Sequence, residues 1–320
     1  MYRYVQGGGG RAQQAFTMAE ILLSLTIIGV VAAITLPSLT GNINERTWNT
    51  QRKALYARFS QAIALMPALN GYGTVDDTTD TAAETFVTNG LAKVLKINNI
   101  CDNEHLDDCG IPDKITAING SIAFSSLPGT LVEYNSFFNF SDTYTYRQLD
   151  TKAAAFETAN GESVAVYYNP FCTPYAERAE SAYYIQPYMC ANFIYDLNGS
   201  KGPNTMGKDI GFITAFYATD SKVVAPVPLN NDLARGNSYS NLQKACKKMD
   251  DESRMPNIDE LASIACNRTL SGVNLSAYGS GTLLQDRTAG GAWGLGIRMN
   301  WGHRLTIRDW DGISFRCIKR

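Results

Sequence analysis

The chain has 320 residues, of which 45% are hydrophobic and 18% charged, and its formal net charge is −2. This composition is typical of a globular chain with one or two cores, and it lacks the basic excess of most nucleic-acid-binding proteins, so no nucleic-acid partner is expected. Seven cysteines without a CxxC pair, together with only two histidines, disfavour zinc clusters and thioredoxin chemistry and favour disulfides in an exported protein.

The N-terminal region combines a short polar segment with a long apolar run. Residues 1–15 carry Arg3 and Arg11 and no acid, whereas residues 16–39 carry a single charge, Glu20. As a helix this run would be about 36 Å long, enough to cross the hydrocarbon core of a bilayer. We therefore predict a transmembrane helix over 16–39 with its N-terminus in the cytoplasm, because positive charge is retained there. A cleaved secretory signal is the alternative, but its small-residue cleavage site would follow the apolar run rather than precede it.

The helical pattern continues beyond the apolar run. An apolar stripe recurs at spacings of three, four or seven and consists of Trp48, Leu55, Phe59, Ile63 and Met66. We predict one long helix over 16–70, whose outer half packs this stripe on a sheet. Pro37 and Gly41 predict a kink or local melting within it.

Residues 71–225 have the mixed pattern of a globular domain. A helix is expected over 84–97, and apolar or alternating runs predict strands over 133–149, 162–169, 189–199 and 209–217. Turn residues between these strands favour an antiparallel meander.

Two cysteine pairs lie in this domain. Cys101 and Cys109 are close enough in sequence to close a small surface loop. Cys172 and Cys190 bracket a tyrosine-rich segment, and we expect them to staple it to the sheet.

The segment DLNGSKGPNTMGKD, residues 196–209, separates two predicted strands and is rich in turn-forming residues. Asp196, Asn198 and Ser200 have the first, third and fifth spacing of oxygen ligands in a calcium loop, and Asp209 is placed to return to the same ion. The glycine and glutamate of an EF-hand are missing, so a Ca²⁺ site and a plain Asn-Gly turn are both open. No other cofactor is expected.

A change of composition precedes the last part of the chain. Residues 226–237, which include Pro226 and Pro228, lack periodicity and indicate a linker. Residues 238–320 then predict a small α+β domain of their own, with helices on either side of Pro256 and short Trp-containing strands at the end.

The stretch AFTMAEILLSLTIIGVVAAITLP, from Ala15 to Pro37, resembles the N-terminal processing and assembly segment of type IV prepilins, which type IV pilins share with type II secretion pseudopilins. The resemblance implies cleavage between Ala15 and Phe16 by a membrane prepilin peptidase, and methylation of the new Phe16 amine. It also implies that Glu20 pairs with the freed amine of a neighbouring subunit and that Pro37 is the helix-kinking proline of the family. Ala15 departs from the usual glycine before the cut. The 196–209 segment is similar to a loop common in pilin-like proteins.

This resemblance implies an α+β, pilin-like fold in which the long N-terminal helix packs on an antiparallel sheet. The implied function is that of a minor pilin or pseudopilin, because a bulky C-terminal head would crowd a filament that carried it at every position. The implied partners are other pilin or pseudopilin subunits, the prepilin peptidase and, before assembly, the bacterial inner membrane. The precursor would be single-pass there, and the mature chain would belong to a periplasmic or cell-surface filament. No enzyme is expected, since GxSxG, HExxH and phosphate-loop motifs are absent from the sequence.

The end of the chain carries a second resemblance. A cysteine-bearing helix, an R-x-P-x-x-x-E-L turn, Trp-containing strands and a terminal F-R-C-I resemble small C-type-lectin-like modules of bacterial surface proteins. The resemblance implies that Cys246 pairs with Cys317 and leaves Cys266 as the odd thiol, although spacing also allows Cys246 to pair with Cys266. The alternative function is thus a filament-tip adhesin or cargo-recognition protein that binds a glycan or another surface ligand. Its candidate contacts are Trp301, His303, Arg304 and Trp310, and the alternative for the two tryptophans is that they belong to the core of the module.

Overall fold

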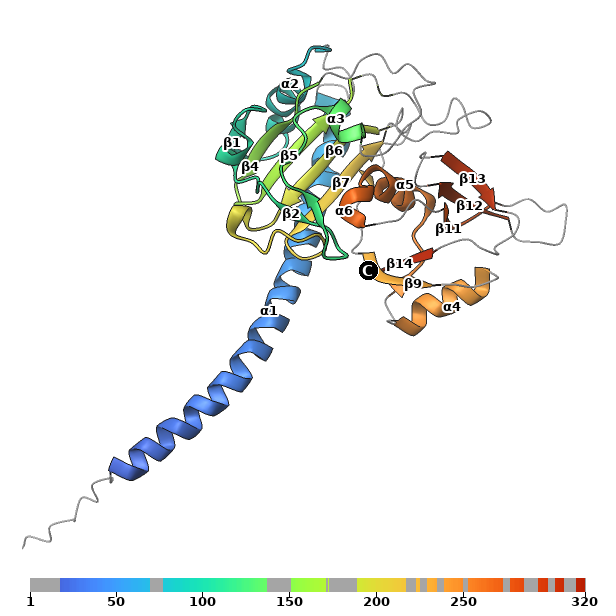
Figure 1. The fold of residues 1–320 in the computed structure, drawn as a ribbon. Helices are drawn as coiled ribbons and strands as arrows, with labels where there is room; N and C mark the ends of the chain where they lie inside the picture. Colours follow the sequence, from blue (N-terminus) through green and yellow to red (C-terminus); the bar gives the residue numbers. More distant parts are fainter. Residues whose placement is uncertain are drawn as a thin grey trace, which may run out of the picture. The chain divides into compact units, whose positions relative to one another are not determined.

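The structure is a computed structural model, and the protein is an α+β protein with an antiparallel sheet, as predicted (Figure 1). The chain divides into two compact units, Met1–Asn49 and Thr50–Arg320. The described residues are 18–69, 77–136, 151–170, 172, 189–216, 223–224, 229–234, 239–249, 253–272, 277–284, 293–298, 303–307 and 315–319.

Helix α1 extends from Met18 to Leu69, within the predicted range of 16–70. Its 52 residues correspond to a length of about 78 Å. The backbone is helical through Pro37 and Gly41, so the expected local melting is absent there. A proline removes only one backbone donor, and a long helix can propagate past such a defect.

No helix among the described residues has a stretch that is both long enough and apolar enough to cross a membrane. The side chains of Glu20 and of residues 32–45 lie outside the described part of α1.

The Thr50–Arg320 unit contains a six-stranded antiparallel sheet in the order β1-β4-β5-β6-β7-β8, of which β4 to β8 form a meander. The predicted strands at 162–169, 189–199 and 209–217 are confirmed as β5, β6 and β7. The strands are β1 (Ile97–Cys101), β4 (Ala154–Thr158), β5 (Ser163–Tyr168), β6 (Met189–Asp196), β7 (Ile210–Phe216) and β8 (Val223–Val224). The helix predicted over 84–97 is shorter: α2 (Ala82–Asn89) ends before Gly90, the 3₁₀ turn η1 (Leu91–Lys93) follows, and Ile97 already belongs to β1.

Helices α1 and α2 contribute the aromatic core on one face of this sheet. Phe59 of α1 lies 5.2 Å from Phe193 of β6 in an edge-on arrangement, measured between ring centroids. Phe86 of α2 stacks on Tyr168 of β5 at 4.4 Å. The predicted apolar stripe is confirmed from Leu55 onward, since its members there are at most 2% exposed. Burial of this kind makes truncation of such a Phe to Ala cost about 3–5 kcal/mol.

The opposite face of the sheet packs against α3, α5 and α6. These elements are α3 (Leu131–Ser136), α5 (Ile258–Cys266) and α6 (Arg268–Ser271), with the small β2–β3 hairpin (Ile115–Thr116 and Ile122–Phe124) beside them. Leu261, Ile264 and Leu270 share one buried cluster with Ile194 of β6 and Phe212 of β7. Helices from the predicted C-terminal domain therefore complete the core of the main sheet.

The strand predicted over 133–149 is wrong in its first part, because residues up to Ser136 belong to helix α3. The Thr130 hydroxyl accepts a hydrogen bond from the Glu133 amide at 3.1 Å, and the Glu133 carboxylate accepts one from the Thr130 amide at 3.3 Å. This reciprocal capping box starts a helix, and it outweighs the apolar alternation that suggested a strand. The rest of the predicted strand lies outside the described residues.

Residues after β8 contribute α4 (Tyr239–Met249) and two three-stranded sheets. One sheet contains β10 (Ser253–Arg254), β14 (Phe315–Lys319) and β9 (Leu229–Ala234), and the other contains β11 (Ala277–Leu284), β12 (Trp293–Arg298) and β13 (His303–Ile307). Strand β9 falls inside the segment predicted as a linker, and its extended backbone pairs with β14.

Three disulfides are present, Cys101–Cys109, Cys172–Cys190 and Cys246–Cys317. They coincide with the pairs expected, and Cys246 does not pair with Cys266. The Cys266 thiol is free and buried, and burial raises its pKa to about 12. A thiol in that state carries almost no thiolate at neutral pH and is chemically quiet.

Candidate functional site

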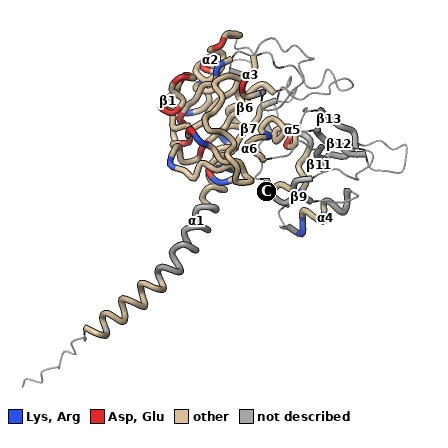
Figure 2. Tube along the Cα trace, in the orientation of Figure 1, with Lys and Arg blue, Asp and Glu red and all other residues tan. Residues whose placement is uncertain are grey.

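The N-terminal part of α1 is apolar and exposed. Nine of the eleven exposed large apolar side chains in the described part of the chain lie within residues 18–31, with exposures from 45% at Ile21 to 77% at Met18. Figure 2 draws the first described turns of α1 in the colour of residues other than Lys, Arg, Asp and Glu; the one charged residue that the sequence has between residues 18 and 31 is Glu20, whose side chain lies outside the described part. The polar Thr26 hydroxyl is satisfied within the helix, because it donates to the Leu22 carbonyl at 2.8 Å. An exposed apolar surface of this size usually marks a site of contact with lipid or with another protein.

The predicted processing residues lie at the start of this segment. Ala15 and Phe16 are outside the described residues. Glu20 and Pro37 are within the helical backbone of α1, but their side chains are outside the described part.

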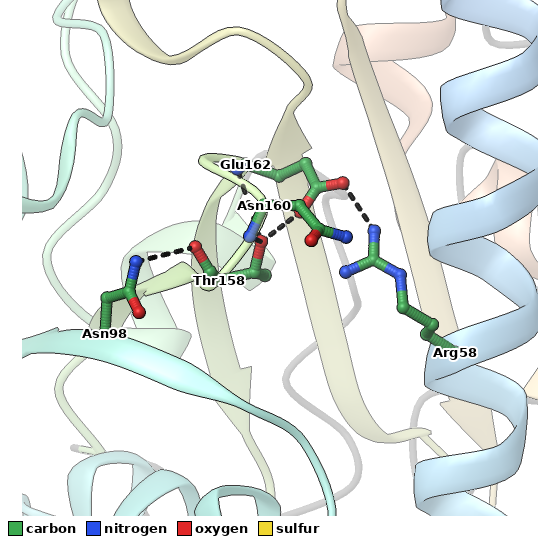
Figure 3. Close-up of polar contacts among 5 residues, drawn as sticks. All are labelled: Arg58, Asn98, Thr158, Asn160 and Glu162. Carbon is green, nitrogen blue, oxygen red and sulfur yellow. Dashed lines mark hydrogen bonds and ion pairs between the residues drawn. The ribbon is translucent and has the colours of Figure 1, made fainter.

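An ion pair joins the other half of α1 to the sheet (Figure 3). Arg58 pairs with Glu162 in the turn between β4 and β5, where the carboxylate also accepts a hydrogen bond from the Thr158 hydroxyl. The Asn160 carboxamide lies beside the same guanidinium and, with its oxygen turned toward Arg58, accepts a hydrogen bond at 2.8 Å. The Glu162 side chain is only 6% exposed, so the pair is largely desolvated on the carboxylate side. Sequence reasoning missed this contact, because nothing local links Arg58 to a turn more than 100 residues away.

The 196–209 loop follows β6 and contains oxygen atoms without partners. Asp196 is 1% exposed; its Oδ1 accepts a hydrogen bond from the Asn198 amide at 3.0 Å, whereas its Oδ2 is buried and has no partner. The Oδ1 atoms of Asn198 and Asn204 are also buried without a partner. Buried acceptors are normally satisfied by a protein group, water or an ion, so these three oxygens are candidates to bind water or a cation.

Asp209 closes the loop from its other end. Its two carboxylate oxygens accept hydrogen bonds from the Asn204 amide at 2.8 Å and the Thr205 amide at 2.9 Å, and the residue is fully buried. Burial, together with the smaller effect of the negative charge of Asp209, raises the pKa of Asp196 to about 7. One loop therefore contains two carboxyl groups and two carboxamides, and such oxygens are the ligands that a hard divalent cation prefers.

The structure favours a different candidate oxygen from the one that the spacing rule named. Ser200 is exposed, whereas Asn204 has a buried oxygen without a partner, so Asn204 is a better candidate ligand than Ser200. The sequence signal for Asn204 was its position after Pro203 in a glycine-rich turn, where it adopts a left-handed φ of 49°. Among the described residues, no group of three or more His, Cys, Asp or Glu side chains is placed to hold a metal. The candidate site here instead depends on two asparagines.

A buried polar network joins α5 and α6 to the sheet. The Asn267 carboxamide contacts the Asn192 carboxamide at 2.8 and 3.0 Å, and it accepts a hydrogen bond from the Tyr134 hydroxyl at 2.5 Å. Thr214 and Ser263 extend the network through their hydroxyls, which lie 2.8 Å apart. Because its members satisfy one another, this network indicates a structural joint rather than a ligand site.

Two of the four residues proposed to contact a ligand on the C-terminal module fall on described backbone. His303 and Arg304 lie on the backbone of β13, opposite Arg298 and Ile297 of β12. Their side chains, and Trp301 and Trp310 entirely, are outside the described residues.

No protein-family model, no curated protein and no solved structure was found to match this chain.

Proposed function

We propose that the protein is a minor pilin or pseudopilin, a structural subunit of a type IV pilus or type II secretion filament. The proposal is supported chiefly by α1, a single helix that exposes large apolar side chains over residues 18–31 and buries an apolar stripe against an antiparallel sheet from Leu55 onward. An exposed apolar surface of this kind is usually buried against lipid or another protein. Lipid before assembly and the helices of neighbouring subunits afterwards are the partners that the AFTMAE segment implies.

Glu20 has a role in this proposal. A lone carboxylate in an apolar run is costly in lipid unless a cation pairs with it. The methylated amine of Phe16, freed by cleavage after Ala15, would supply that cation from the neighbouring subunit. Glu20 would thus set the register of one subunit on the next.

Processing is tested by expressing the full chain in a bacterium that has a prepilin peptidase and measuring the mass of its N-terminal peptide. We expect a peptide that begins at Phe16 and carries one methyl group. Ala15→Leu should block this cleavage, and Gln14→Ala, next to it, should not. Cleavage after the apolar run, or an N-terminus at Met1, would contradict the proposal.

Assembly is tested separately, by counting the chain in purified filaments. Glu20→Ala should remove it from the filaments, whereas Ser24→Ala, a change in the same apolar run without loss of charge, should not. Normal incorporation of Glu20→Ala would rule out the assembly role of Glu20 without affecting the processing result.

We also propose that the 196–209 loop binds Ca²⁺ through Asp196, Asn198 and Asn204, with Asp209 adding negative charge. The unpartnered oxygens of the first three residues support this second role. Calorimetric titration of the full chain in detergent should show one Ca²⁺ bound per chain, and Asp196→Asn should abolish binding. Equal heats for the wild-type chain and Asp196→Asn would contradict it.

A further inference from the structure

We propose that Arg52 couples the 196–209 loop to helix α1, so that Ca²⁺ in the loop stabilises the first turns of α1 within the Thr50–Arg320 unit. This inference rests on the proposed Ca²⁺ site. It adds a consequence for the helix on which filament assembly would depend.

The first contact is made with the end of the loop. The Arg52 Nη2 donates hydrogen bonds to the carbonyl oxygens of Gly207 and Lys208, both at 2.8 Å. These two carbonyls directly precede Asp209, the buried acid of the loop. Hydrogen bonds from a charged donor are stronger than those between neutral groups.

The second contact is made at the start of the loop. Arg52 also hydrogen-bonds the hydroxyl of Tyr195, which is 2% exposed and directly precedes Asp196. Successive side chains of a strand point to opposite faces, so Tyr195 faces the same side as Phe193, which packs on α1, and Asp196 faces the other side. One guanidinium of α1 therefore contacts the chain immediately before each of the two acids.

A change in the position of the Asp209 carboxylate can reach the carbonyls that Arg52 binds, because the end of the loop is one hydrogen-bonded turn. The Lys208 amide donates to the Thr205 carbonyl at 3.0 Å, and the Gly207 amide donates to the Ile210 carbonyl at 3.0 Å. The Asp209 carboxylate binds the amides of Asn204 and Thr205 in the same turn. A shift of the Asp209 or Asn204 oxygens thus displaces the two carbonyls that Arg52 binds.

The direction of the coupling follows from the charges. Without a cation, the buried Asp196 and Asp209 carboxylates repel each other and the free oxygens of the loop have no partner, which favours opening of the turn. A bound Ca²⁺ removes both costs and holds the Gly207 and Lys208 carbonyls at Arg52. Coupling is reciprocal, so a helix that is held by Arg52 also favours Ca²⁺ binding by the same factor.

Amide hydrogen exchange of the full chain in detergent, with Ca²⁺ or with EGTA, tests the coupling. In the wild-type chain we expect Ca²⁺ to slow exchange in two places, residues 196–209 and the α1 amides of residues 52–58. In Arg52→Met, which keeps the apolar stem and removes the donors, Ca²⁺ should slow exchange in the loop only. Lys53→Met, an exposed neighbour that loses the same charge, should behave as the wild type does.

Calorimetry supplies a second readout. The Kd for Ca²⁺ should rise about fivefold or more in Arg52→Met and be unchanged in Lys53→Met. An unchanged or lower Kd in Arg52→Met would overturn the coupling; a lower one would mean that removal of a nearby positive charge outweighs ordering of the loop.

The outcomes separate the two proposals. If Ca²⁺ binds and protects the loop while exchange at residues 52–58 of the wild type is unchanged, the coupling is wrong and the Ca²⁺ site stands. If no Ca²⁺ binds, both are wrong. The wild-type comparison decides the coupling even if Arg52→Met does not fold.

Discussion

Replacing Asp196 by Asn should stabilise the cation-free protein at neutral and alkaline pH. The ordinary pKa of 3.8 is raised to about 7 in the folded protein, chiefly by burial and also by the charge of Asp209. Between these values the folded chain holds a proton that the unfolded chain releases, so the free energy of unfolding falls as pH rises from about 4 to about 7. At about 1.36 kcal/mol per pH unit, the loss amounts to about 4 kcal/mol above pH 7.

The carboxamide introduced by Asp196→Asn avoids this loss because it is neutral and its oxygen can still accept a hydrogen bond from the Asn198 amide. Without Ca²⁺ at pH 8, we therefore expect Asp196→Asn to be more stable than the wild type by up to about 4 kcal/mol. Near pH 4 the two should be alike. Adding Ca²⁺ should reduce this difference, since a ligand contributes about 2.7 kcal/mol at 100 times its Kd, and about 4.1 kcal/mol at 1,000 times its Kd, to the chain that binds it.

Urea unfolding of the full chain in detergent, followed by tryptophan fluorescence from pH 4 to 8, measures these differences. Asp113→Asn, a change at an exposed acid, is the matched control and should change neither the pH dependence nor the response to Ca²⁺. The reasoning is refuted if Asp196→Asn is less stable than the wild type at pH 8 without Ca²⁺, or if the difference between them does not vary with pH.

Other contacts predict effects of similar size. Arg58→Met should lower the free energy of unfolding by about 3 kcal/mol in urea titrations, because it leaves the Glu162 carboxylate buried and unpaired. Adding Glu162→Gln should restore part of the loss. A double variant that is no more stable than Arg58→Met would count against this pair. Asn267→Ala should cost about 2–3 kcal/mol in the same assay, since it leaves the Tyr134 hydroxyl and its neighbours short of a partner, and a loss below about 0.5 kcal/mol would contradict the network. Iodoacetamide should add no group to the native chain and one group, at Cys266, to the unfolded and unreduced chain, as measured by mass; a second adduct would show that a disulfide is missing.

Short-range patterns were enough for several parts of the fold. The spacing from Leu55 to Met66 predicts the buried stripe of α1, and alternation between turn residues predicts β5, β6 and β7. These features depend on the period of the backbone, which neighbouring residues reveal. The pattern misled where a local cap competed with it, as in α3, where Thr130 and Glu133 start a helix in a segment that alternates like a strand.

For the 196–209 loop, too, the sequence predicted some features and missed others. Its position, its turn residues and its oxygen spacing were visible in the sequence, and two of the residues named there, Asp196 and Asn198, each have a buried oxygen without a partner. The choice of Asn204 over Ser200 as a candidate ligand depends on how the turn folds back on Asp209, which the spacing rule of a different loop does not describe. Arg52 had no sequence signal at all, since its partners lie 155 and 156 residues away.

The sequence by itself determined the long helix, its apolar first segment, the central meander and the AFTMAE resemblance on which the proposed filament role rests. Each of these features depends on residues that are close to one another along the chain. The tertiary structure alone decided that α5 and α6 complete the core of the main sheet, that β9 pairs with β14, that Arg58 meets Glu162 and that Arg52 reaches the 196–209 loop. The physical reason is that burial and pairing between distant segments depend on which surfaces the folded chain brings together.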